Sequence, residues 1–244
     1  MEKFPILVSI PHSSLFVPKE ILSNLIATQF DLRNMTDLYT DEIFSVTNAF
    51  TVFGEINRLI LNLNRAPEGI KEDCQYSVST TIGPDGKRIF KTMPTIEEVQ
   101  ELITRYHRPF HRKIENLIKE KNIKFFLDGH SMWSTRPPNM YGNGDPRPDI
   151  CLGNLEYTTC GKTDTDFVRK FFESKGYTVK VNDPYTGKYN IAYHCSHDGL
   201  RGLQIEINRA IFMNEKTLEA YPEQIDKLHE EMTELVEKLA KRFE

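Results

Sequence analysis

Two histidines and a glutamate stand where strand-like runs could present them for metal chemistry. His12 follows one short apolar run, His130 follows another, and Glu206 lies within a third. A catalytic zinc is commonly held by two histidines and a carboxylate, with an open position for water. Water bound to such an ion reaches a pKa of about 7 and becomes a nucleophile. Because small residues flank both histidines, we expect His12 and His130 to be ligands in a site for metal-assisted hydrolysis.

The third ligand is open at this stage. The position three residues after His12, a common place for a ligand acid, is Leu15. Asp37, expected at the start of the next helix, is the first choice, and Asp41 and Glu42 are the alternatives. An acid in a first helical turn could instead interact with the helix dipole.

Glu206 is the expected general base and acid. An acid within an apolar strand is desolvated, which raises its pKa toward the working range of a proton carrier. The alternative is that Glu206 forms an ion pair with Arg201 or Arg209.

Further polar residues are expected to bind the substrate. Arg58 and Arg65 lie on either side of Asn64 in an otherwise apolar stretch. An arginine binds a carboxylate through two parallel hydrogen bonds, or stabilises an oxyanion. The alternative for both arginines is a surface salt bridge.

A second pair of histidines, His107 and His111, has a spacing of four on one helix face. That spacing can bind a metal, but the glutamate of the HExxH pattern is missing. We therefore expect these two residues to be structural or to support the site, and we expect His194 to lie in a polar loop.

Strand-like and helix-like segments alternate along the chain. Strands are expected at 6–10, 51–56, 59–63, 123–127, 150–152, 177–181 and 203–207, and helices at 36–49, 95–117, 164–175 and from 222 onward. This alternation predicts an α/β fold in which a mixed sheet is sandwiched between helices, with residues 1–244 forming one domain. Ligands of such sheets bind beyond the carboxyl ends of strands, where the residues above stand.

Composition narrows the function classes. The chain has 244 residues and a formal net charge of −4, which does not favour nucleic acid or an anionic membrane as a partner. Its four cysteines form no CxxC pair, and no apolar run approaches the roughly 20 residues that span a bilayer. We expect a cytoplasmic protein.

The motifs in combination resemble those of the N-formylglutamate amidohydrolase family. They are Ile-Pro-His-Ser at 10–13, Leu-Asp-Gly-His-Ser-Met at 127–132 and Gln-Ile-Glu-Ile-Asn-Arg at 204–209. The resemblance spans about residues 6 to 215. It implies a hydrolase that removes formate from N-formyl-L-glutamate in histidine degradation. It also implies a phosphorylase/hydrolase-like fold similar to zinc exopeptidases of the carboxypeptidase type.

The resemblance also implies roles for individual residues. One divalent metal, with zinc favoured, would be held by His12, Asp37 and His130, while Glu206 moves the proton. Asn64, Arg65 and Arg209 would bind the substrate, and Arg58 would polarise the scissile carbonyl. The alternatives are a carboxypeptidase-like or peptidoglycan-directed hydrolase, and an inactive relative that binds an amino acid.

Overall fold

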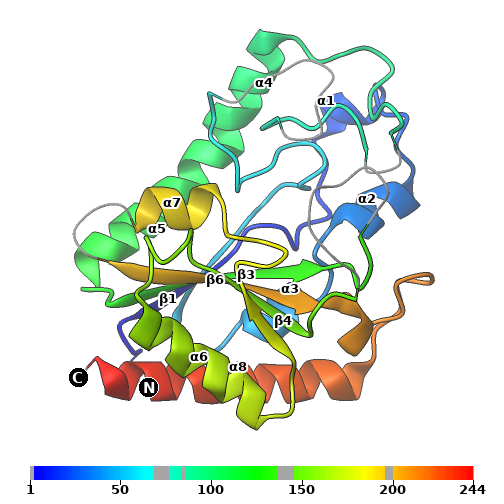
Figure 1. The fold of residues 1–244 in the computed structure, drawn as a ribbon. Coiled ribbons are helices and arrows are strands. Elements are labelled where there is room, and N and C mark those ends of the chain that lie inside the picture. The colour runs from blue at the N-terminus through cyan, green and yellow to red at the C-terminus, as the bar shows by residue number, and fades with distance from the viewer. Residues whose placement is uncertain (1–2, 69–76, 84–85, 137–145, 196–199, 244) are drawn as a thin grey trace.

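The computed structural model describes residues 3–68, 77–83, 86–136, 146–195 and 200–243. Within them, one mixed sheet has six strands in the order β2-β1-β3-β6-β4-β5 (Figure 1). The strands are β1 (Ile6–Ile10), β2 (Phe50–Phe53), β3 (Phe125–Met132), β4 (Ile150–Gly153), β5 (Val179–Val181) and β6 (Arg201–Asn208). Neighbouring strands are parallel except β4 and β6, which are antiparallel. The expected mixed α/β sheet is confirmed.

Helices cover both faces of this sheet. They are α1 (Lys19–Leu22), α2 (Gln29–Met35), α3 (Thr40–Phe44), α4 (Ile96–Leu102), the π-helical turn η1 (Ile103–His107), α5 (Arg108–Glu120), α6 (Lys162–Ser174), α7 (Tyr189–His194), the 3-10 turn η2 (Arg209–Ile211) and α8 (Pro222–Arg242). One hydrophobic core joins α3, α6 and α8 to the sheet, and a second joins α4 and α5 to it. The long α8 runs beneath the sheet in Figure 1.

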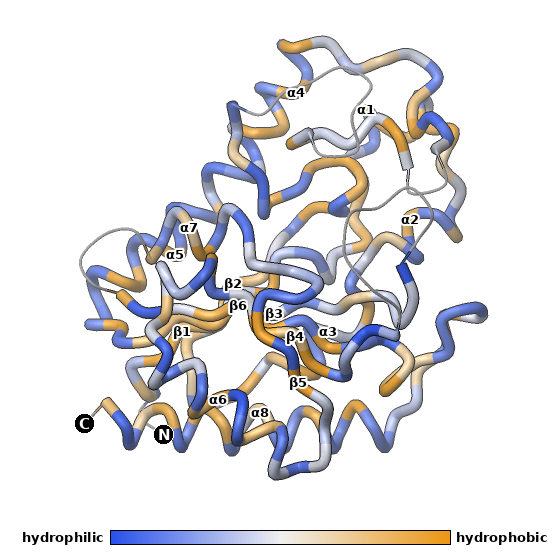
Figure 2. Tube along the Cα trace, in the orientation of Figure 1, coloured by the Kyte–Doolittle hydropathy of each residue, from blue (hydrophilic) through white to orange (hydrophobic). Residues whose placement is uncertain are grey.

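The sequence explains these layers. The residues of β1 and β3 are buried throughout, as expected of central strands that have helices on both sides. The helix α8 alternates between hydrophobic and hydrophilic segments in Figure 2, and its buried side chains recur every three or four residues. Burial of that stripe against the sheet is what keeps α8 in place.

Three expectations about elements near the site are wrong. The stretch 59–63 forms turns and no strand, because the side chain of Asn57 accepts from the backbone of Leu59 and closes a turn there. The helix expected at 36–49 is only α3, because Tyr39 before it has a left-handed backbone with φ of 65°. The strand expected to end at 127 continues through Met132 as β3, so His130 lies inside a strand.

Gly129, in the middle of β3, has no room for a side chain. A Cβ atom at this position would lie 2.7 Å from the ring of the buried Phe44. We predict that Gly129→Ala lowers the free energy of unfolding by about 1–3 kcal/mol, since an overpacked core must shift. Denaturant unfolding measures this change.

The control is Gly161→Ala, where a Cβ meets nothing within 4 Å. Alanine caps a helix less well than glycine, which lowers the free energy of unfolding, but it also lowers the entropy of the unfolded chain, which raises that free energy. We therefore expect the free energy of unfolding to change by less than about 0.5 kcal/mol. Equal stability of the two variants would contradict the packing described for Gly129.

Candidate metal and substrate site

Three buried residues from separate segments meet at the carboxyl end of β1. His12 follows β1, His130 lies on the neighbouring strand β3, and Asp37 lies in the connection between α2 and α3. The backbone N–H of Asp37 donates to the carbonyl of His12 at 3.0 Å, which joins the two segments directly. The two imidazole rings have centroids 4.9 Å apart. The fold therefore brings together the three residues that the sequence selects.

The ligand atoms of this group have the spacing of a metal site. Nδ1 of His12 lies 3.4 Å from Oδ2 of Asp37, and Nδ1 of His130 lies 3.3 Å from the same oxygen. One ligand atom from each residue lies within 4.8 Å of the others. A tetrahedral zinc with bonds of about 2.0–2.1 Å separates its ligand atoms by about 3.3–3.4 Å. The donor set and its spacing fit such an ion.

The outer ring nitrogens indicate how the histidines are protonated. Nε2 of His12 lies 2.9 Å from Oδ1 of Asn62, an oxygen that can only accept, so this nitrogen carries the proton. Nδ1 of His12 is then a lone pair, and it is buried without a hydrogen-bond partner. Burial lowers the pKa of His12 to about 3, which keeps the ring neutral. An orphaned lone pair that faces a carboxylate is the arrangement that a bound cation would satisfy.

His130 has a different partner on its outer nitrogen. Nε2 of His130 donates to Oδ2 of Asp128 at 2.8 Å, and Asp128 in turn accepts from Ser9 and from Nδ2 of Asn190. Burial lowers the pKa of His130, but Asp128 and Asp37 outweigh it and raise that pKa to about 10. A cation at Nδ1 would therefore replace a proton, and the carboxylate of Asp128 would increase the basicity of the ring.

The second oxygen of Asp37 is held by two arginines. Oδ1 accepts from Nη1 of Arg58 at 3.1 Å and from Nη2 of Arg209 at 2.9 Å. Burial raises the pKa of Asp37, but Arg58 and the facing imidazoles outweigh it and hold that pKa well below its usual range. Asp37 is thus an anion with one oxygen fixed and the other directed at the two histidines.

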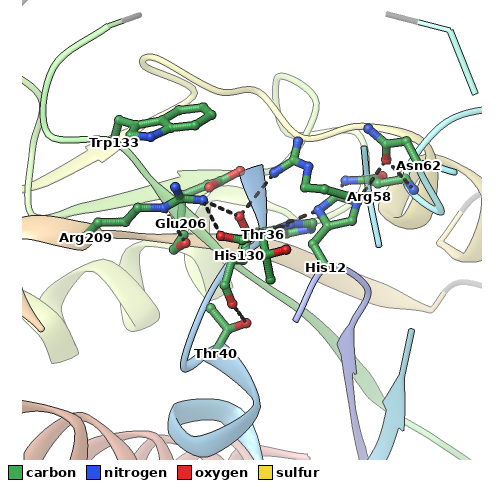
Figure 3. A network of polar contacts seen from close by, with 12 residues as sticks. His12, Thr36, Thr40, Arg58, Asn62, His130, Trp133, Glu206 and Arg209 are labelled. Atoms are coloured by element: carbon green, nitrogen blue, oxygen red, sulfur yellow. Dashed lines mark hydrogen bonds and ion pairs between the residues drawn. The ribbon is translucent and has the colours of Figure 1, made fainter. Parts of the chain in front are cut away.

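Arg209 is placed differently from Asn64 and Arg65, the other residues expected to bind the substrate. Its guanidinium is only 1% exposed, and it also donates to the side chain of Ser131 and to the carbonyls of Asn34 and Thr36. Trp133 stacks over it, with 4.5 Å between the guanidinium carbon and the ring centroid (Figure 3). Arg209 does not line the cavity described below. Its placement favours the fixing of Asp37 over contact with a substrate.

A cavity of about 560 Å³ opens onto the histidines. It is lined by His12, Arg58, Asn62, Asn64, Arg65, His130, Ser131, Trp133, Pro184, Tyr185, Thr186, Lys188, Gln204 and Glu206. Its lining carries the cations Arg58, Arg65 and Lys188, and among the described lining residues Glu206 is the one acid. A small anionic molecule would suit this lining.

Glu206 lies beside the histidines because β6 pairs with β3 in a register that places it opposite His130. Burial raises the pKa of Glu206 to about 7. Nε2 of Gln204 donates to its Oε1 at 2.8 Å. The two arginines considered as partners of Glu206 pair with other acids, since Arg201 donates to Asp164 and Arg209 donates to Asp37. A buried carboxylate with such a pKa can both accept and return a proton near neutral pH.

The two alternatives for the third ligand do not reach the histidines. Asp41 and Glu42 lie on α3 and are exposed, whereas Asp37 is buried between the rings. The sequence reasoning missed Asp128 and Asn62, the residues that hold the outer nitrogens. The signal for Asp128 was available, because residues two apart on a strand share a face and Asp128 stands two positions before His130.

Comparisons with known proteins give the family. The model of the N-formylglutamate amidohydrolase family matches residues 4–213. The crystal structure of the N-formylglutamate amidohydrolase from Ralstonia eutropha JMP134 is similar, with 26% identity, a TM-score of 0.88, and coverage of 99% of this chain and 95% of that one. The gene product Atu2144 from Agrobacterium tumefaciens has 19% identity and a TM-score of 0.73, covers 98% and 92% of the two chains, and supports the fold alone. No curated protein matches the chain.

A search of the described helices finds none with the length and apolar character needed to cross a membrane. The family match covers most of the chain, and the fold agrees with it throughout. The chain therefore belongs to the N-formylglutamate amidohydrolase family, and we conclude that it is an amidohydrolase.

Proposed function

We propose that this amidohydrolase cleaves the N-acyl amide of N-formyl-L-glutamate, or of a similar small N-acyl amino acid, with the help of one divalent metal, and that it serves histidine degradation. Zinc is the favoured ion, held by His12, Asp37 and His130. The observation that carries the proposal is the convergence of two imidazole Nδ1 atoms on one buried carboxylate, directly beside Glu206. The size and the cationic lining of the cavity favour a small anionic substrate over a peptide.

The metal, when bound, would supply Lewis acidity toward the scissile carbonyl and make a water acidic enough to attack at neutral pH. The protein supplies the proton transfers. Glu206 would accept a proton from the attacking water at its carboxylate and return it to the amide nitrogen as the C–N bond breaks. Gln204 holds one oxygen of Glu206, which fixes the direction of the carboxylate.

The cations of the cavity would hold the substrate. Arg58 reaches into the cavity while it also bonds Asp37, and it can stabilise negative charge on the former carbonyl oxygen. Asn64 and Arg65 would bind the α-carboxylate of the amino acid. Trp133 and Tyr185 add aromatic surface to the lining.

The direct test is a panel of N-acyl amino acids assayed for release of the free amine. We predict hydrolysis of N-formyl-L-glutamate, loss of that activity after exhaustive chelation, and recovery with zinc or cobalt, because the site would polarise the amide only with its ion. Full activity in metal-free protein would exclude the metal role. A preference for a neutral or peptide substrate would overturn the proposed substrate.

The identity of the carboxylate ligand can be tested by metal binding alone. We predict that Asp37→Asn weakens Co²⁺ binding by at least about 100-fold, since a ligand charge is lost beside two histidines. Asp41→Asn is the matched control and should bind Co²⁺ as the wild type does, because Asp41 is exposed on α3. If Asp37→Asn does not fold, His12→Ala replaces it. Equal affinity of wild type and both site variants would place the metal elsewhere.

The role of Glu206 predicts a rate loss and a pH profile. Glu206→Gln should retain the metal and lose about 10²–10⁴-fold in kcat, the usual contribution of a general base. The base acts when ionised, so wild-type activity should fall as the pH drops through about 7, or through a lower value when a cation favours the carboxylate. Metal analysis shows whether the variant retains its ion, steady-state kinetics measure the loss in kcat, and a pH–rate profile of the wild type measures the pH dependence. Near-normal turnover of Glu206→Gln would assign the base to another group.

A further inference from the structure

The segment 62–65 carries three cavity-lining side chains but forms neither a helix nor a strand. Asn62 holds His12 through its Oδ1, and the same oxygen accepts from the backbone N–H of Asn64. Asn64 and Arg65 face the cavity. Buried backbone carbonyls outside helices and strands need hydrogen-bond donors, and those donors keep the segment in place.

Two histidines outside the cavity supply those partners. Nε2 of His111 donates to the carbonyl of Leu63 at 3.0 Å, and Nε2 of His107 donates to the carbonyl of Arg65 at 2.8 Å. The carbonyl between them, that of Asn64, accepts from Nη1 of Arg65 at 3.2 Å. Three consecutive carbonyls of the segment are thus held by side chains.

The helix that carries these histidines is built to present them together. His107 and His111 are four residues apart, and their ring centroids lie 4.4 Å apart. His107 ends the π-helical turn η1, directly before α5. A π-helical turn inserts an extra residue into a helix and changes which face the residues before it present, and such turns are frequent at functional sites.

The short helix α7 supplies a third histidine, His194, which contacts His111. Because Nε2 of His111 donates to a carbonyl, its Nδ1 must accept, and Nε2 of His194 supplies that hydrogen bond at 2.8 Å. The neighbouring Asn190 donates from its backbone to Oδ1 of Asn64 and from its side chain to Asp128. Burial lowers the pKa of His111 to about 2 and that of His194 to about 4, so both rings stay neutral.

The arrangement excludes the simpler interpretation of this pair as a second metal site. The Nε2 atoms of His107 and His111 face carbonyl oxygens, and Nδ1 of His111 faces His194. Within the described ranges, His12, Asp37 and His130 form the group whose ligand atoms could hold an ion. His107 and His111 therefore act on the protein backbone.

We infer that His107 and His111 are positioning residues, which hold the segment 62–65 so that Asn64 and Arg65 face the substrate carboxylate. The inference rests on the proposed function for the identity of the substrate. Neither histidine touches the cavity, and both act through the backbone of the segment. The hydrogen bond of His107 to the residue that would bind the carboxylate makes it the better residue to test.

The test compares His107→Phe, which keeps a ring but loses the donor, with His107→Gln, whose amide nitrogen can replace Nε2. We expect His107→Phe to raise KM for N-formyl-L-glutamate by about tenfold, more than it lowers kcat, because one hydrogen bond to a partly buried carbonyl is lost. His107→Gln should restore KM to near the wild-type value. For the α-carboxamide of N-formylglutamate, which lacks the bound carboxylate, the loss in kcat/KM should shrink to less than about threefold.

Two further measurements separate positioning from a general loss of structure. Hydrogen exchange of a peptide covering 60–67 should speed up in His107→Phe and not in His107→Gln, with metal content unchanged in both. His229→Phe is the matched control, because His229 also contacts a backbone carbonyl, that of Glu42, but lies on α8 away from the cavity. It should leave KM and this exchange unaltered. If His107→Phe does not fold, His107→Asn, with its shorter amide, replaces it.

Each outcome decides the inference. Equal losses for the acid and the carboxamide, failure of His107→Gln to restore KM, or unchanged exchange at 60–67 would overturn it. If the wild type hydrolyses no N-acyl amino acid, the proposed function fails, while the exchange comparison still decides whether His107 holds the segment.

Discussion

The buried carboxylate of Asp37 is the constraint on which the site depends. One of its oxygens is held by Arg58 and Arg209, and the other lies between Nδ1 of His12 and Nδ1 of His130. An ionised group in such a place is stable only while its partners remain, and removing one partner of a buried pair costs several kcal/mol. Its backbone is also bonded to that of His12. The ion pairs of Asp37 and its backbone hydrogen bond to His12 together hold this acid next to both histidines.

The sheet places Glu206 beside this group of residues. Asp128 and His130 share a face of β3, and Gln204 and Glu206 share a face of β6, since residues two apart on a strand point the same way. The pairing of the two strands sets His130 opposite Glu206. The proposed metal ligand His130 and the proposed proton carrier Glu206 are therefore positioned by backbone hydrogen bonds between central strands, which are among the most rigid parts of a fold.

The sequence predicted the elements with strong hydrophobic patterns and the residues that stand at their ends. The strand at 6–10, the long helix from Thr95 and the terminal helix from Pro222 were each predictable. The strand is a continuous apolar run, and the helices repeat apolar residues every three or four positions. The segment 59–65 was not predictable, because the side chain of Asn57 closes a turn there and the distant His107 and His111 hold its carbonyls. The left-handed backbone of Tyr39 shortened an expected helix. The role of Arg209 was equally hidden, since only the tertiary structure shows that its donors are taken by Asp37 and by backbone carbonyls.

We propose that His12, Asp37 and His130 together hold one divalent ion, and anomalous X-ray diffraction from crystals of the zinc-loaded protein would locate that ion. We expect a single strong zinc peak at about 2.0–2.2 Å from Nδ1 of each histidine and from Oδ2 of Asp37. A peak bound through other residues, or the absence of any peak in protein that hydrolyses its substrate, would rule out this metal site.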